Sequence, residues 1–136
     1  MGDAEVRAVV AHEADVPVEG GAGGAFGSVT WRTLLSADRT PTDALTVGIA
    51  EVLPGDGTPV RLHRHAQAEA YYVIAGEGIM AIEGDETPLR AGSVVFIPGG
   101  RWHAARATGT EVLRLLYAFA TDSFADVVYE FDGESA

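Results

Sequence analysis

Short runs rich in β-branched and aromatic residues, separated by turn residues, do most to constrain the fold of this chain. No stretch repeats at the helical period, and only residues 122–125 favour a single helical turn. Turn chemistry such as Glu83-Gly84-Asp85 or Pro98-Gly99-Gly100 stands between the runs. Many short strands at regular spacing predict a closed all-β barrel or sandwich. We expect strands at residues 28–35, 44–53, 70–75, 78–83, 93–97, 112–119 and 127–131.

The length of 136 residues suits one domain with its own buried core. We expect residues 28–136 to form the barrel domain and residues 1–27 to form an N-terminal extension that ends in a glycine-rich loop. The apolar run at residues 6–13 fits either a strand or a peripheral extension. The glycine spacing in residues 20–27 does not match a dinucleotide-binding loop, so we expect no cofactor role there.

The charge and composition exclude several classes of partner. The net charge is −11, which disfavours nucleic acid and anionic membranes as partners. No apolar run approaches the roughly 20 residues of a membrane helix, and the acidic N-terminus lacks a hydrophobic signal, so we expect a cytoplasmic protein. The chain has no cysteine, which rules out disulfides and thiol catalysis. Any transition-metal site must therefore use imidazole and carboxylate ligands.

Two blocks of sequence contain such ligands. His63 and His65 lie two residues apart in a strand and so project to the same face. Glu69 leads an apolar strand, where burying a carboxylate is costly unless a positive charge compensates it. The bend at residues 98–100 can bring His103 from another strand onto the same ion. Alone, each residue has an ordinary interpretation as a surface histidine, an ion-paired carboxylate or a partly buried histidine; their joint spacing favours a metal site.

Such a site would bind one divalent transition metal, namely iron, manganese, nickel, cobalt or zinc, with positions open to a small-molecule substrate. Tyr71 shares a strand face with Glu69 and is the candidate catalytic residue, as a proton or hydrogen-bond donor, although an aromatic ring there can also serve packing alone. His12 lies outside both blocks, and we expect no role for it. Strand parity does not fix the direction of Arg61, Arg101 and Arg114, which would favour an anionic substrate if they faced inward.

The two blocks resemble the signature motifs of the cupin superfamily. Residues 57–76 match the first motif: glycine, five residues, His-x-His, three residues, glutamate, six residues, glycine. Residues 92–103 match the second motif, and Ala107 stands where the family expects asparagine. The resemblance implies a double-stranded β-helix, or jelly-roll, barrel with the metal inside. Because the motifs occur once, it also implies a small single-domain cupin (a monocupin), which is commonly a homodimer.

The resemblance leaves the reaction open, because cupins with these ligands include dioxygenases, decarboxylases, sugar-phosphate isomerases, polyketide cyclases and sulfonium-compound lyases. Our first hypothesis is an iron-dependent dioxygenase-type oxidoreductase acting on a small organic molecule. The alternative is an oxygen-independent enzyme in which the metal acts as a Lewis acid, as a cyclase, isomerase, lyase or decarboxylase. A third possibility is a cupin that binds a small molecule without turning it over.

Overall fold

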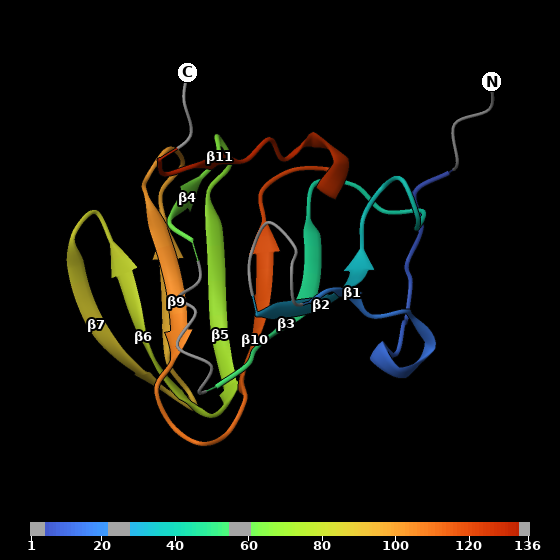
Figure 1. The fold of residues 1–136 in the computed structure, drawn as a ribbon. Coiled ribbons are helices and arrows are strands. Elements are labelled where there is room, and N and C mark those ends of the chain that lie inside the picture. The colour runs from blue at the N-terminus through green and yellow to red at the C-terminus, as the bar shows by residue number, and fades with distance from the viewer. Residues whose placement is uncertain (1–4, 22–27, 55–60, 134–136) are drawn as a thin grey trace.

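The chain folds into two antiparallel sheets that face each other, as the computed structural model shows for residues 5–21, 28–54 and 61–133 (Figure 1). The larger sheet has the order β1 (Glu19–Gly20), β2 (Val29–Leu35), β3 (Thr46–Val52), β10 (Leu113–Phe119), β5 (Glu69–Ala75) and β8 (Val94–Ile97). The smaller sheet has the order β11 (Glu130–Phe131), β4 (His63–Arg64), β9 (His103–Ala107), β6 (Glu77–Ile82) and β7 (Asp85–Arg90). This arrangement confirms the predicted all-β jelly roll.

The core lies between the sheets because the central strands alternate buried and outward side chains. In β10, every second residue from Leu113 to Phe119 is buried. In β5, Glu69, Tyr71 and Val73 point inward, whereas Tyr72 is exposed on the outer face. β10 pairs with β3 on one side and β5 on the other, so these three strands form the middle of the larger sheet.

Six of the expected strands lie within two residues of β2, β3, β5, β6, β8 and β10. The expected strand at 127–131 is reduced to β11, and the helical turn expected at 122–125 is the short 3-10 helix η2 (Phe124–Asp126). β7 was not expected because half of its residues are charged and it includes Pro88, which an edge strand tolerates. β9 was not expected because His-Ala-Ala-Arg-Ala has weak strand preference.

The N-terminal residues run along the outside of the larger sheet. The 3-10 helix η1 (Glu13–Asp15) is held there because Arg32 Nη1 donates hydrogen bonds to the carbonyls of Glu13 and Val16, at 3.0 and 2.6 Å. Residues 6–13 are thus a peripheral extension rather than a strand, although β1 does pair with β2. The boundary between residues 27 and 28 stays a prediction. Residues 22–27, the turn at 55–57 and the start of the first motif at 57–60 lie outside the described residues.

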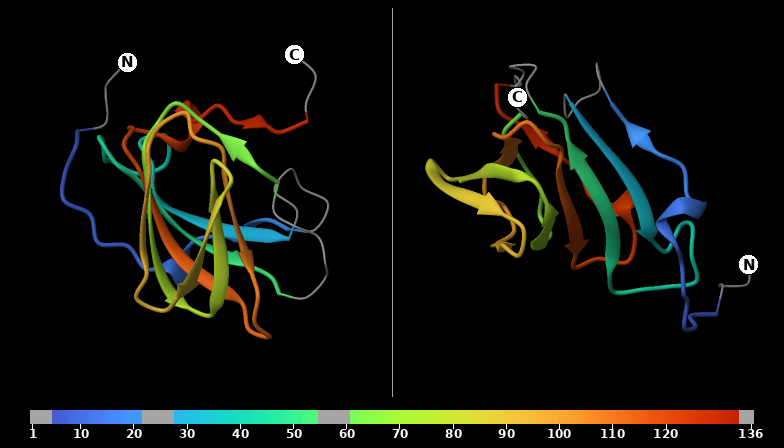
Figure 2. Two further views of the ribbon diagram at one scale, coloured as in Figure 1. Left: turned by 90° about the vertical axis from the view of Figure 1, so that its left-hand side faces the viewer. Right: turned by 90° about the horizontal axis from the view of Figure 1, so that it is seen from below.

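Residues 120–131, which we call the closing segment, cross one end of the roll after β10 (Figures 1 and 2). Near its start, the backbone N–H of Phe124 donates to Ser36 Oγ at 2.9 Å. At its end, β11 pairs with β4, with Phe131 opposite His63. The segment is therefore fixed at both ends. In the described parts of the chain no helix is long and apolar enough to cross a membrane.

Candidate metal centre and its cavity

Three of the four predicted metal ligands come together inside the roll. The ligand atoms of His65, Glu69 and His103 all lie within 4.8 Å of one another, and all three side chains are buried. Glu69 Oε1 is 3.1 Å from His65 Nε2 and 3.4 Å from His103 Nε2. The loop after β4, the first residue of β5 and the first residue of β9 each supply one of these groups.

His63 lies beside this cluster rather than in it. It is buried on β4, and its ring centroid is 4.4 Å from that of His103 and 6.3 Å from that of His65. The structure thus brings three of the four predicted ligands into one cluster and places the fourth, His63, against its edge, although all four were expected around one ion.

Backbone carbonyls orient all three imidazoles in the same way. Nδ1 of His63 lies 2.7 Å from the carbonyl oxygen of Arg61, Nδ1 of His65 lies 2.9 Å from that of Gln67, and Nδ1 of His103 lies 2.8 Å from that of Arg101. A carbonyl only accepts hydrogen bonds, so each Nδ1 carries the proton and donates it. This leaves Nε2 as the ring nitrogen that faces Glu69 and could bind a metal, which is the usual arrangement around ligating histidines.

The electrostatics of the cluster favour a charged Glu69 beside a neutral His63. Burial opposes ionisation of Glu69, but the neighbouring imidazoles of His103 and His65 outweigh it, and the pKa of Glu69 falls below its usual value. Burial, with repulsion from His103 as the next cause, lowers the pKa of His63 to about 4. The acid is therefore charged and His63 neutral at pH 7, and these are the protonation states in which both groups bind metal.

The donor set fits a divalent transition metal. His103 Nε2 is buried and makes no hydrogen bond within the described part of the chain. Buried polar atoms are almost always satisfied, so such an atom beside a buried carboxylate indicates a missing partner. The cluster of His65, Glu69 and His103 can hold the ion, and His63 is placed to join them.

A cavity of about 80 Å³ adjoins the donor cluster. His63, Glu69 and Tyr71 line one part of it, and Tyr71 is buried at 8% exposure. Burial raises the pKa of Tyr71 well above its usual value. Pockets for drug-sized ligands are typically about 300–1,000 Å³, so this cavity suits a molecule much smaller than a drug.

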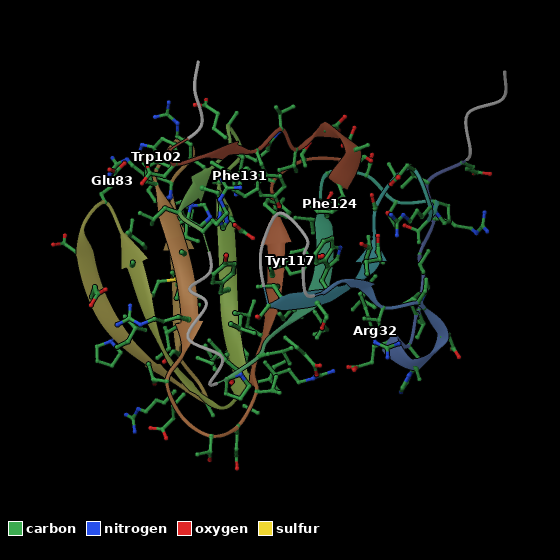
Figure 3. The ribbon with its side chains drawn as sticks, in the orientation of Figure 1. Arg32, Glu83, Trp102, Tyr117, Phe124 and Phe131 are labelled. Carbon is green, nitrogen blue, oxygen red and sulfur yellow. The ribbon has the colours of Figure 1, made fainter. Side chains whose placement is uncertain are left out.

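The rest of the cavity wall is largely aromatic, which the sequence did not reveal. Trp31 comes from β2, Tyr117 from β10, and Phe124 and Tyr129 from the closing segment. Figure 3 shows Phe124 and Tyr117 on the same side of the roll, away from Trp102 and Glu83. The alternation of β10 could have indicated Tyr117, but no sequence pattern places Phe124 or Tyr129 near the ligands.

The three arginines whose side-chain directions the sequence did not fix do not line the cavity. Arg61 and Arg101 are exposed, and Arg114 pairs with Glu13 and Glu51 on the outer face of the larger sheet. No lysine or arginine is among the described residues that line the cavity. This removes the main support for a polyanionic substrate. His12 is exposed and accepts a local hydrogen bond from the backbone N–H of Ala14.

Several characterised proteins are similar to this chain in sequence. It is 39% identical over 117 residues to a dimethylsulfoniopropionate lyase from Ruegeria pomeroyi, covering 86% of this chain and 75% of that protein. It is 33% identical over 94 residues to an oxalate-binding protein from Thermotoga maritima, covering 68% and 76%. A gentisate 1,2-dioxygenase from a Ralstonia species is 29% identical over 98 residues, covering 67% of this chain but only 26% of the dioxygenase.

Among solved structures, the polyketide cyclase RemF from Streptomyces resistomycificus superposes with a TM-score of 0.76 at 21% identity, covering 95% of this chain and 88% of the cyclase. That similarity shows a shared fold. The sequence model of the cupin domain matches residues 48–119, which is more than half of the chain. With its jelly-roll sheets and its clustered histidines and glutamate, the chain belongs to the cupin family.

Proposed function

We propose that this protein is a metal-dependent lyase that cleaves a small sulfonium carboxylate by β-elimination, without dioxygen. The observation that carries the proposal is the 39% identity to a dimethylsulfoniopropionate lyase over 86% of the chain. That relative supports the oxygen-independent alternative better than the dioxygenase-type hypothesis, since the dioxygenase relative shares only a quarter of its own length.

The reaction needs a base beside the substrate and no oxidant. The proton on the carbon next to the carboxylate passes to the base, and its electron pair forms a carbon–carbon double bond. The carbon–sulfur bond then breaks, and its electron pair leaves on sulfur as a neutral dialkyl sulfide. The products are the sulfide, an unsaturated carboxylate and one proton, so atoms and electrons balance.

Tyr71 is our candidate for the base. It lines the cavity two residues after Glu69 on the same face of β5, so it lies next to the donor cluster without belonging to it. Glu69 is a poorer choice because its carboxylate is among the ligands. A base must stand within hydrogen-bond reach of the proton that it removes, and the place of Tyr71 on the cavity wall supports this role.

His63, His65, Glu69 and His103 would hold the divalent ion. When bound, such an ion supplies positive charge that polarises the substrate carboxylate and stabilises the deprotonated form of Tyr71. Most of the cavity wall is apolar, and an apolar surrounding strengthens such electrostatic interactions. In this proposal the buried donors hold the ion that polarises the substrate, and Tyr71 accepts the proton.

Anaerobic turnover tests this proposal. Purified protein loaded separately with iron, manganese, nickel, cobalt or zinc is incubated with dimethylsulfoniopropionate in sealed, oxygen-free vessels. We expect the volatile sulfide and the unsaturated carboxylate in equal amounts, measured by gas chromatography and NMR. Turnover that appears only after dioxygen is admitted, with oxygen uptake, would restore the dioxygenase hypothesis.

A non-catalytic binding role is the second candidate. It is favoured by the 33% identity to an oxalate-binding protein over 68% of this chain. Tight calorimetric binding of oxalate, with no product from either substrate class after prolonged incubation, would select this role over the lyase.

A further inference from the structure

Aromatic side chains form a continuous wall along the cavity. The ring centroids of Trp31 and Phe124 are 6.2 Å apart, and those of Phe124 and Tyr129 are 6.3 Å apart. Tyr129 in turn lies 5.5 Å from the ring of His63 and 5.4 Å from that of His65. The wall therefore runs from β2 to the donor cluster, and a ligand bound at the cluster has aromatic rings beside its other end.

The charge inside the cavity favours a cation at that end. Glu69 is the one carboxylate among the described residues that line it, and no lysine or arginine lines it. The face of an aromatic ring is negative and attracts a cation, and it does so more strongly in a site from which water is excluded. A ligand with a carboxylate at one end and a methylated cation at the other would match the donor cluster and the wall respectively.

The wall is fixed before any ligand arrives. Ser36 is fully buried and accepts a hydrogen bond from the backbone N–H of Phe124, at 2.9 Å. Ser123 Oγ donates to Asp38 at 3.0 Å, and Phe124 also stacks on Phe119 with ring centroids 6.0 Å apart. Rings that are already ordered bind a ligand without an additional entropic cost.

We propose that Trp31, Phe124 and Tyr129 determine specificity by selecting a positively charged, methylated head group over a neutral group of the same shape. The selection concerns the same site as the proposed lyase function and rests on it for the position of the carboxylate. It predicts that quaternary ammonium carboxylates bind as well as sulfonium carboxylates, because the wall recognises charge and methyl surface rather than sulfur.

Two ligands of equal shape test the selection. Calorimetry on the metal-loaded protein compares trimethylammonium propanoate with its tert-butyl analogue, in which carbon replaces nitrogen. We call them the charged and the neutral ligand after their head groups, since both keep the carboxylate. We expect the charged ligand to bind about tenfold more tightly. In Phe124→Leu and Tyr129→Leu, which keep apolar volume but remove a ring, the preference should fall to about threefold or less, while the neutral ligand keeps its affinity.

Phe96→Leu is the matched control, since Phe96 is 68% exposed on β8 outside the cavity and the same change there should leave the preference unaltered. Equal affinities for the two ligands, no binding of either, or a preference that survives in the Phe124→Leu, Tyr129→Leu double variant would each overturn the inference. The charged ligand binding preferentially without any lyase product would overturn the proposed function and leave the selection standing. Elimination of dimethylsulfoniopropionate together with equal affinities for the two ligands would support the proposed function and overturn the selection.

Discussion

His63 and His103 are directly paired residues on the neighbouring strands β4 and β9, and their ring centroids are 4.4 Å apart. Paired residues on adjacent antiparallel strands project to the same side of a sheet, so the pairing itself brings the two motifs of the sequence together. His103 also lies 3.4 Å from Glu69 on the opposite sheet. His103 therefore links the ligands of the smaller sheet to the carboxylate of the larger one.

Loss of a ligand should remove the metal. We expect His103→Ala and Glu69→Gln to lower metal affinity at least tenfold, and elemental analysis after dialysis should show little bound metal. His63→Ala should do the same if His63 completes the set. Metal addition should raise the melting temperature of the unsubstituted protein and not that of these variants. His12→Ala, which changes an exposed histidine, should behave like the unsubstituted protein; retention of full metal content in His63→Ala would remove that residue from the site.

Replacing the candidate base should stop the reaction without emptying the metal site. Tyr71→Phe removes only the hydroxyl, and we expect lyase turnover to fall about 100-fold or more with metal content unchanged. Tyr72→Phe is the matched control because Tyr72, the next residue, is 51% exposed on the outer face of β5. Equal turnover in both variants would assign the base to another group.

A methyl group at residue 48 should destabilise the middle of the larger sheet. A Cβ there would lie 2.3 Å from the hydroxyl of Tyr117 and 2.6 Å from the backbone carbonyl of Arg32, which is part of β2 and cannot turn aside. We expect Gly48→Ala to lower the free energy of unfolding by about 2 kcal/mol or more. Gly109→Ala, where the nearest atom is 3.8 Å away, should change it by less than about 0.5 kcal/mol. Urea denaturation of both variants measures the difference.

Acid should weaken the contact between β1 and the loop after β2. Arg39 donates hydrogen bonds to both oxygens of Glu19, at 2.8 and 3.1 Å, and lowers the pKa of Glu19 despite its partial burial. A lowered pKa adds stability above the unfolded pKa, near 4.5, and that stability is lost as the pH falls through the folded value. The cost of Glu19→Gln should thus be a few tenths to about 1 kcal/mol at pH 7 and shrink toward pH 3. A cost that does not change between these pH values would contradict the assignment.

The strands that the sequence predicted are those rich in β-branched, aromatic and other apolar residues. In β5 and β10, which are largely apolar, every second side chain is buried in the core at least along the first five residues. β7 and β9 form for reasons outside their own sequences: β7 pairs with β6 across the turn at Glu83 and Gly84, and β9 pairs with β6 along its full length. Glu83 adopts a positive φ of 49° in that turn, beside Gly84 at 89°.

Three of the four candidate ligands lie close together in the sequence, whereas the residues of the cavity wall come from distant parts of the chain. His63, His65 and Glu69 lie within seven positions of one another, and strand parity alone orients the first two. Phe124 is held beside the cavity by a hydrogen bond from its backbone N–H to Ser36 Oγ, 88 positions earlier in the sequence. The cytoplasmic location and the homodimer stay predictions; sedimentation velocity would test the latter.

Because Phe124 and Tyr129 belong to the closing segment, the two motifs alone do not form the complete cavity wall. A fragment spanning residues 61–107 would carry all four histidine and glutamate donors yet lack β10, Phe119 and the rings that shut the far side. Binding of an ion and a ligand in this cavity would therefore require the whole roll to be complete, because a half-folded chain lacks part of the cavity wall.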